Sequence, residues 1–400
     1  MNNIRKITTD LFYVGVSDRK LALFENIYPV PQGVSYNSYV LLDEQTVLLD
    51  TADASVAHNF FENVEAALDG RELNYLVVNH MEPDHCALIS DILLRYPEVK
   101  IVSNAKAIAM IKQFFNINIE DRTVLVGEGD TLCTGRHTLH FVLAPMVHWP
   151  EAMVTYDSTD KILFSADAFG TFGAINGNLY ADEVDFEHRY IDEARRYFCN
   201  IVGKYGTSVQ ALLKKAATLE ISMICPLHGF VWRENLTWFI EKYNLWSTYT
   251  PENKSVMLVY GSIYGNTENV ANLVASKLAD KGVKGIAVYD ASHTDVSYLV
   301  AESFKFSHIV VAASTYNAGI FTPIENFLLD LKAHNLQNRT FALIENGTWA
   351  AQSGKQMCTM LETLKNNTIL ENTISIKSAL KETQADEVET FVNQILESLK

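Results

Sequence analysis

One short stretch, residues 75–86 (YLVVNHMEPDHC), constrains this chain more than any other part of the sequence. It begins with an apolar run, which predicts a strand buried on both faces of a sheet. Four side chains that can bind a metal follow directly: His80, Glu82, Asp84 and His85. Alternate residues of an extended segment share a face, so the first three can converge on one point. Pro83 predicts a helix start that brings in His85, whereas the alternative is a polar loop with ordinary capping residues.

Three further candidate ligands each follow a strand-like run: His148, Asp167 and His228. Open α/β sheets place their sites at the carboxyl ends of strands, which is where these residues fall. Taken singly, a histidine near a strand end is more often a hydrogen-bonded structural residue, and Asp167 is equally suited to a turn. Together with the first cluster they provide four histidines and three carboxylates. Such a set is large enough to hold two metal ions.

Two different patterns of strands and helices divide the chain. As far as about residue 250, strand segments rich in aromatic and β-branched residues form two groups with helical segments outside them, which predicts a four-layer αββα sandwich. The polar segment 248–254, which contains a proline, is the expected boundary. Beyond it, five strand segments alternate with helix-length segments, which predicts a doubly wound parallel sheet. We therefore expect two domains of the α/β class, 1–250 and 254–400.

Composition and charge restrict the classes of function. A length of 400 residues, 48% apolar and 20% charged, is typical of a soluble globular protein with room for two or three domains. The net charge of -16 argues against binding to nucleic acid or to an anionic membrane. No stretch is apolar for the ~20 residues of a membrane span, and the N-terminus lacks the apolar core of a signal peptide. The five cysteines never form CxxC, so we expect a cytoplasmic, reduced protein without a disulfide framework, a thiolate zinc site or an attached rubredoxin module.

Three loops at strand ends of the second domain predict a ligand with a phosphate and a flat ring. The first precedes a helix and offers backbone and hydroxyl donors to a phosphate, but lacks the lysine of nucleoside triphosphatase loops. Its alternative is a plain turn with an N-cap. The other two set an aromatic residue beside small polar ones, which suits a stacked ring. The candidate residues are Ser262, Ile263, Tyr264, Gly265, Asn266 and Thr267, then Ser314, Thr315, Tyr316, Asn317 and Gly319, and finally Asn346, Gly347, Thr348 and Trp349.

The order HxExDH, H, D, H of the candidate ligands resembles the metallo-β-lactamase superfamily, whose zinc hydrolases carry HxHxDH instead. Glu82 stands in place of the second histidine, and this variant resembles the flavodiiron proteins, or A-type flavoproteins. The segments APMVHWPEAM, SADAFG and PLHGFVWR also match the pattern of that family. The three loops of the second domain resemble those of flavodoxin, which implies FMN as a cofactor. The resemblance covers essentially the whole chain, in the order metallo-β-lactamase-like domain and then flavodoxin-like domain.

The family resemblance implies two non-haem irons. By position, one iron would be held by His80, Glu82, His148 and Asp167, and the other by Asp84, His85, Asp167 and His228, with Asp167 as the bridge. The chemistry of Glu82 is consistent with this, because a hard oxygen donor favours iron or manganese over zinc. Three carboxylates and one hydroxide would also cancel the charge of two ferrous ions, which suits a buried site that changes its redox state.

Two further positions bear on the resemblance. Tyr197 matches a family tyrosine close to the metals that donates a hydrogen bond or a proton, although a packed helical tyrosine is the alternative. Near residues 24–26 some relatives carry a histidine that reaches the iron pocket, and this sequence has none there. Proton delivery from that position is therefore unassigned in this chain.

The resemblance implies an oxidoreductase that passes electrons from FMN to the diiron centre and reduces dioxygen to water or nitric oxide to nitrous oxide. It also implies a head-to-tail homodimer. The electron donor is expected to be separate, either rubredoxin or, as in some relatives, reduced coenzyme F420. Two alternatives remain open. One is a zinc-dependent hydrolase with a regulatory flavodoxin domain, against which Glu82 argues, and the other is an electron carrier that uses only its flavin.

Overall fold

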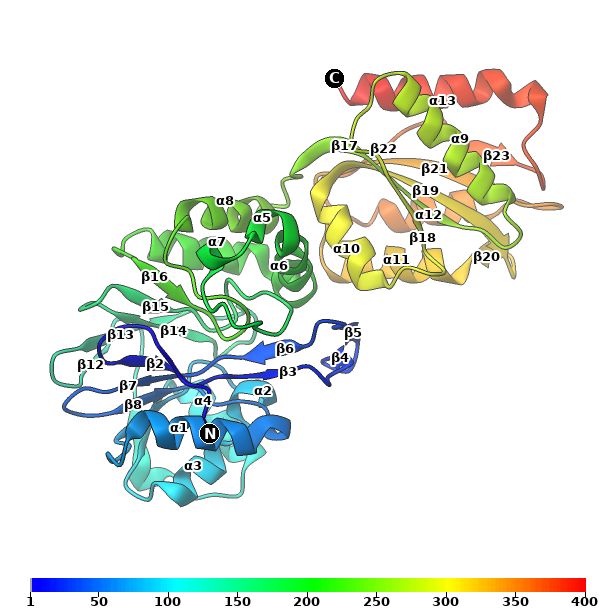
Figure 1. Cartoon of the computed structure of the whole chain (residues 1–400). Helices are drawn as coiled ribbons and strands as arrows, with labels where there is room; N and C mark the ends of the chain where they lie inside the picture. The colour runs from blue at the N-terminus through cyan, green and yellow to red at the C-terminus, as the bar shows by residue number, and fades with distance from the viewer. Residues whose placement is uncertain (1) are drawn as a thin grey trace. The chain divides into compact units, whose positions relative to one another are not determined.

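The computed structural model describes residues 2–400, which form two compact units (Figure 1). The first unit runs to Phe198 and resumes over Thr207–Asn244, and the second holds Cys199–Gly206 and Leu245–Lys400. The limits 1–250 and 254–400 remain our prediction for the domains. Within the described residues, no helix combines the length and the apolar character needed to span a membrane.

Two sheets form the centre of the first unit. One has the strand order β1-β2-β7-β8-β9-β10-β11, parallel from β8 onward, and the other has the order β12-β13-β14-β15-β16, with only the last pair parallel. Two small pairs, β3–β6 and β4–β5, lie apart from these sheets. The strands are β1 Arg5–Lys6, β2 Leu11–Tyr13, β3 Val16–Asp18, β4 Leu23–Phe24, β5 Tyr28–Pro29, β6 Val34–Tyr36, β7 Tyr39–Leu41, β8 Val47–Leu49, β9 Tyr75–Val77, β10 Lys100–Ser103, β11 Thr123–Leu125, β12 Thr131–Cys133, β13 Thr138–Leu143, β14 Met153–Asp157, β15 Ile162–Phe164 and β16 Met223–Cys225.

Helices cover the outer faces of these two sheets. Figure 1 shows α1 and α3 outside the first sheet and α7 and α8 outside the second. Between the sheets lies a core to which both contribute, for example Tyr39 and Val77 from one and Phe141 and Phe164 from the other. The predicted αββα sandwich is therefore confirmed. The helices are α1 Ala57–Leu68, α2 Pro83–Cys86, α3 Ile89–Arg95, α4 Ala105–Phe114, α5 Phe186–Arg189, α6 Ile191–Tyr197, α7 Gly206–Ala216 and α8 Leu236–Ser247, with a π-helical turn at Phe198–Val202.

The second unit is a doubly wound sheet, as predicted. Its main strands are parallel in the order β18-β17-β19-β21-β22, β23 also pairs with β21 in parallel, and β20 pairs with β19 in antiparallel fashion. Helices α9 and α13 lie on one face and α10 to α12 on the other (Figure 1). The strands are β17 Asn253–Gly261, β18 Ala287–Asp290, β19 Phe306–Tyr316, β20 Gly319–Ile320, β21 Thr340–Asn346, β22 Thr368–Ile369 and β23 Ile374–Ile376. The helices are α9 Asn266–Asp280, α10 Val296–Lys305, α11 Thr322–Ala333, α12 Ser353–Leu361 and α13 Ala385–Ser398.

A buried arginine ties the chain after α8 to the second sheet. Arg339 donates from Nη1 to the backbone oxygen of Tyr249 at 2.6 Å, and from Nε and Nη2 to the backbone oxygens of Ser303 at 2.7 Å and Phe304 at 2.6 Å. Burial lowers the pKa of Arg339 to about 9. The guanidinium thus donates to buried backbone oxygens. It stabilises the second unit at the point where the chain enters it after α8.

Candidate metal centre and cofactor cavity

The segment with the candidate ligands leaves the first sheet at the carboxyl end of β9 and turns into α2. Glu82 is the N-cap of α2 in an extended conformation, and Pro83 is the first helical residue, as the sequence predicts. Behind this turn, the buried carboxylate of Asp50 accepts hydrogen bonds from the backbone N–H of Asn79 at 2.7 Å and of His80 at 3.3 Å. These bonds fix the chain where it delivers its side chains to a buried pocket.

Four of the predicted side chains form one group: His80, Glu82, His148 and Asp167. The Nε2 atom of His148 lies 2.9 Å from Oε2 of Glu82 and 3.2 Å from Oδ2 of Asp167. The Nε2 atom of His80 lies 3.1 Å from the same oxygen of Asp167. Two imidazole nitrogens and two carboxylate oxygens therefore face a common point.

The remaining three side chains form a second group: Asp84, His85 and His228. The Nε2 atom of His228 lies 3.0 Å from Nε2 of His85 and 3.3 Å from Oδ2 of Asp84. Asp167 reaches this group with its other oxygen, Oδ1, which lies 3.2 Å from Nε2 of His85. One carboxylate thus offers an oxygen to each group, which is the geometry of a bridging ligand. The structure brings together all the candidate ligands that the sequence identified.

The unsatisfied atoms of this pocket fit a pair of cations. Both carboxylate oxygens of Asp84 and of Asp167 are buried and receive no hydrogen bond, which is costly unless a cation is present. His228 faces the backbone oxygen of Ser35 with its Nδ1 at 2.7 Å. That contact assigns the proton to Nδ1, so its Nε2 presents a lone pair to His85. Convergent lone pairs of nitrogen and oxygen are the donor set that a transition metal binds.

Glu151 orients one of the histidines from outside the pocket. Its Oε1 lies 2.9 Å from Nδ1 of His80 and accepts the backbone N–H of Met81, also at 2.9 Å. Although burial opposes it, the contact with His80 holds the pKa of Glu151 below its usual value. Burial also opposes a charge on His80, but Asp167 and the neighbouring glutamates raise the pKa of His80 well above its usual value. Protons and metal ions therefore compete for this pocket.

Aromatic side chains close one side of the pocket. Tyr197 at the end of α6 is fully buried, and its ring centroid lies 5.1 Å from that of Phe172 and 5.5 Å from that of His228. Its hydroxyl has no hydrogen-bond partner. Burial, and then Asp167, raise the pKa of Tyr197 well above its usual value, so the hydroxyl keeps its proton. A Cβ atom at Gly170 would lie 2.5 Å from this ring, which explains the glycine there.

The hairpin β4–β5 brings a residue to the pocket that the sequence did not identify. Glu25 lies in the turn between the two strands, and it is an exposed residue whose carboxyl is influenced by that of Glu82. Partial desolvation of the carboxyl, together with Glu82, raises the pKa of Glu25 to about 8. A glutamate in a turn gives no sign in the sequence that it lies close to a metal ligand. The only available signal was its position in the segment where some relatives have a histidine.

A third group of possible ligands, Asp10, His137 and Asp160, lies elsewhere in the first unit. Arg136 lies between two of its members. The Nη2 atom of Arg136 donates to Oδ2 of Asp10 at 3.0 Å and to Oδ2 of Asp160 at 2.9 Å. His137 lies between Asp10 and Asp157, with its ring nitrogens at 3.0 and 2.7 Å from their carboxylates. The guanidinium already supplies the positive charge, so this cluster is an ion-pair network rather than a metal site.

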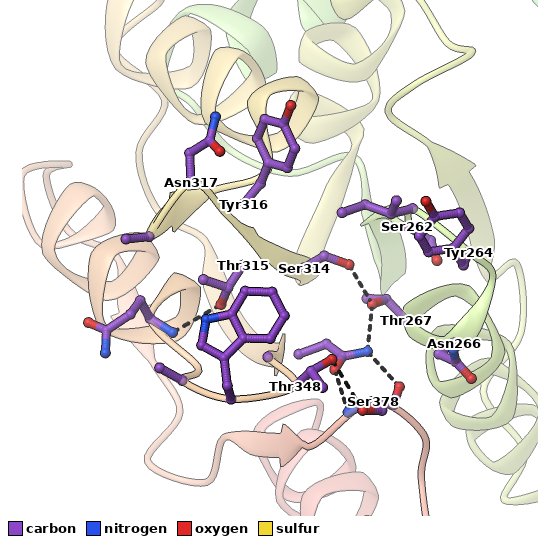
Figure 2. A pocket seen from close by; sticks show the side chains of 17 residues that line it. Ser262, Tyr264, Asn266, Thr267, Ser314, Thr315, Tyr316, Asn317, Thr348 and Ser378 are labelled. Carbon is purple, nitrogen blue, oxygen red and sulfur yellow. Dashed lines mark hydrogen bonds between the residues drawn. The ribbon is translucent and has the colours of Figure 1, made fainter.

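A cavity of about 440 Å³ opens at the carboxyl edge of the second sheet (Figure 2). Its lining residues are Ser262, Ile263, Tyr264, Asn266, Thr267, Ser314, Thr315, Tyr316, Asn317, Ala318, Asn346, Gly347, Thr348, Trp349, Ala350, Gln352 and Ser378. Of the residues predicted to bind the cofactor, only Gly265 and Gly319 do not line it. Those that the sequence analysis missed are Ala318, Ala350, Gln352 and Ser378. Ser378 follows β23, so extending the rule of strand ends to this last strand would have found it.

One end of the cavity suits a phosphate. Helix α9 begins at Asn266 after an N-cap glycine, Gly265, with a φ of 88°, and no side chain caps it. Its first N–H groups are therefore available to an anion. Figure 2 shows the hydroxyls of Thr267 and Ser314 directed at each other from α9 and β19, with Oγ1 and Oγ 2.9 Å apart. The amide of Asn346 donates to the same Thr267 oxygen at 3.3 Å.

The other end of the cavity suits a flat apolar ring. Tyr264 and Trp349 are each 92% exposed, although large aromatic side chains are usually buried. No charged side chain lines the cavity within the described part of the chain. Neutral walls with exposed aromatic rings suit stacking on a conjugated ring system and hydrogen bonds to its polar edge.

Comparisons with known proteins agree with both sites. Residues 34–229 match the family model described as ODP family beta lactamase, and residues 258–391 match the model for flavodoxin. An uncharacterized protein of Methanocaldococcus jannaschii is 33% identical over 81% of each chain. An anaerobic nitric oxide reductase flavorubredoxin of Vibrio vulnificus is 30% identical over 86% of this chain and 70% of that protein. This chain is a flavodiiron protein.

Solved structures of flavodiiron proteins share the fold. The rubredoxin oxygen:oxidoreductase of Desulfovibrio gigas superposes with a TM-score of 0.93 at 24% identity, over 99% of this chain and 98% of that one. The flavodiiron protein of Giardia intestinalis gives a TM-score of 0.92 at 24% identity, over 99% and 96% of the chains. As a flavodiiron protein, this chain is an oxidoreductase whose cofactors are FMN and two non-haem irons.

Proposed function

We propose that this flavodiiron protein reduces dioxygen to water, nitric oxide to nitrous oxide, or both, with electrons that enter at FMN and pass to the irons. The bridging position of Asp167 between two ligand groups, one of which contains Glu82, carries the proposal. The names of similar proteins support it, because the Vibrio protein is a nitric oxide reductase and the Desulfovibrio protein is an oxygen oxidoreductase.

In this proposal the ligands divide as the geometry groups them. His80, Glu82, His148 and Asp167 would hold one iron, and Asp84, His85, Asp167 and His228 would hold the other. Irons bound there would supply Lewis-acid and redox chemistry to the diatomic substrate. Glu151 and the backbone oxygen of Ser35 keep the rings of His80 and His228 in orientation, because each occupies the Nδ1 that faces away from the pocket.

Tyr197 is the proposed donor of a hydrogen bond or proton at the irons. Its hydroxyl is buried, keeps its proton and has no other partner. Phe24 and Phe172 flank its ring and exclude water from that side. In the second unit, the start of α9 would hold the phosphate of FMN, and the exposed aromatic side chains of the cavity would contact its ring.

We also propose a head-to-tail homodimer with a separate electron donor, rubredoxin or reduced coenzyme F420. Two exposed apolar patches support the dimer. One is the hairpin tip at the metal pocket, with Leu23 at 40% and Ile27 at 56% exposure. The other surrounds the flavin cavity, with Tyr264 and Trp349 at 92%. A second copy that covered both patches would join flavin and metals of different subunits. The scattered free cysteines support a reducing, cytoplasmic location.

The test is a single-turnover experiment on purified, iron-loaded and FMN-loaded protein. After anaerobic reduction it is mixed with dioxygen or nitric oxide, and the flavin spectrum and the gas are followed together. Flavin oxidation coupled to loss of gas supports the proposal, and the faster gas identifies the preferred substrate. Flavin oxidation that proceeds unchanged after the metals are removed contradicts it, because the electrons would then bypass the irons.

The zinc-dependent hydrolase is not favoured by the comparisons, since the named relatives are oxidoreductases. Glu82 also provides an oxygen donor to the first ligand group, where its Oε2 lies 2.9 Å from Nε2 of His148. An electron carrier without metal chemistry would leave the buried carboxylates of Asp84 and Asp167 without a role. Both alternatives predict no turnover of either gas.

A further inference from the structure

The first unit contains a second cavity, lined by two arginines, that neither proposed cofactor uses. It has a volume of about 330 Å³ and is bounded by β1, β3, helix α1 and the loop 175–179. None of its lining residues is a candidate metal ligand, and none lines the flavin cavity. Its volume falls within the range of small-molecule sites. The cavity is therefore large enough to hold a ligand of its own.

The two arginines, Arg5 and Arg19, carry charges that no carboxylate neutralises. Among the described residues neither forms an ion pair with an acidic side chain, and no aspartate or glutamate lines the cavity. Asp18 precedes Arg19 in the sequence, but its Oδ1 accepts two backbone N–H groups instead, at 2.7 and 3.2 Å. The whole chain has 48 acidic and 32 basic side chains. A cavity with two arginines and no acid is thus opposite in charge to the rest of the protein.

The hydrogen bonds within this cavity occupy acceptors and leave donors free. The Nη2 atom of Arg19 donates to the backbone oxygen of Ile175 at 2.6 Å, and Nη1 of Arg5 donates to the backbone oxygen of Gly177. The Oγ atom of Ser17 accepts the backbone N–H of Ile175 at 2.9 Å, so its own proton remains to be donated. A guanidinium has more N–H donors than these contacts use. The two arginines, held on one loop, and the hydroxyl therefore form a set of donors that suits an oxyanion.

We propose that this cavity binds a small molecule through an oxyanion, a phosphate or carboxylate group, placed between Arg5 and Arg19. Guanidinium groups bind both kinds of oxyanion through charge-assisted and often bidentate hydrogen bonds. The neutral side chains of Asn3 and Asn59 also line the cavity and offer hydrogen bonds to the rest of the ligand. The alternative is that the arginines only anchor the loop, and this predicts that no ligand binds.

The test is isothermal titration calorimetry of the iron-loaded and FMN-loaded protein with inorganic phosphate and with succinate, at constant ionic strength. Arg19→Gln removes one guanidinium. Asn59→Asp places a carboxylate in the cavity, and Asn59 forms no hydrogen bond among the described residues that this change would break. Lys20→Gln and Gln113→Glu are matched controls, because both are exposed residues of the same unit that do not line the cavity. Circular dichroism, iron content and FMN content report on folding.

The expected result is saturable binding of one anion per chain, and the tighter of the two probes identifies the oxyanion as phosphate or carboxylate. The Kd should rise at least about tenfold in Arg19→Gln and in Asn59→Asp, since a hydrogen bond to a charged group contributes this much. Both controls should bind like the wild type.

Three outcomes would overturn the inference. In the first, neither anion binds the wild type saturably, and the arginines then serve only the loop. In the second, binding is equal in the wild type and in both cavity variants, so the anion occupies another place. In the third, Lys20→Gln loses as much affinity as Arg19→Gln, because the general charge of the surface and not the cavity would then attract the anion.

Discussion

Glu151 offers a sharp test of how the pocket prepares its ligands. Its Oε1 contacts Nδ1 of His80 and the N–H of Met81, each at 2.9 Å, and its Oε2 is buried without a partner. In Glu151→Gln the amide oxygen can keep the first two contacts, but the NH2 group then occupies a position without an acceptor. The variant removes the negative charge that makes His80 a stronger donor and adds an unsatisfied polar group.

The expected effect is a 10- to 100-fold loss of iron affinity, or about 1.4–2.7 kcal/mol. The assay is anaerobic competition with a ferrous chelator, with flavin content as the internal control, because Glu151 belongs to the first unit. Glu128→Gln is a matched control. Its Oε2 also accepts a backbone N–H, that of Leu143 at 2.8 Å, but it is exposed and belongs to none of the ligand groups.

Iron affinity in Glu151→Gln within about twofold of the wild type would refute this reasoning, because loss of an outer hydrogen-bond partner typically costs 10- to 100-fold. An equal loss in Glu128→Gln would refute it as well. In that case a general loss of stability, and not the orientation of His80, would explain the result.

Three further predictions concern other parts of the chain. Thr267→Val should weaken FMN binding roughly 10- to 100-fold in a fluorescence titration, because it removes a hydroxyl from the phosphate end, while iron content stays the same. Arg339→Met should destabilise the second unit by at least about 3 kcal/mol, because buried backbone oxygens lose their donor, and flavin should be released at lower urea concentration. Although burial opposes it, Asp157 and Asp10 raise the pKa of His137 to about 9. Its contribution to stability should be complete below about pH 6.5 and lost as the pH rises through 9, and His137→Asn should flatten this part of the urea-unfolding profile.

The candidate metal ligands could be picked out from the sequence because local rules place them, and the structure brings them together. Each follows a strand of the two sheets, and the fold brings the carboxyl ends of neighbouring strands together. Pro83 marked the start of α2 correctly, because its fixed backbone angle suits the first turn of a helix. The loops of the cofactor cavity could be predicted by the same rule, because they follow strands of the second sheet.

The residues that escaped the sequence analysis act through contacts between distant segments. Glu151 meets His80 only because β14 and its preceding loop lie beside the end of β9, where Met153 donates its N–H to the backbone oxygen of Asn79 at 3.0 Å. Glu25 lies in a short hairpin with two left-handed residues, a conformation that its sequence does not favour. Neither position carries a local pattern, so only the three-dimensional structure reveals it.

The most direct test of the account is the metal and flavin content of the purified protein, measured together with its visible spectrum. We predict about two irons and one FMN per chain, with the irons lost in Asp167→Asn and the flavin retained. Two zincs without iron, after expression in iron-replete medium, would contradict the diiron centre. Glu82 would then be the residue to explain.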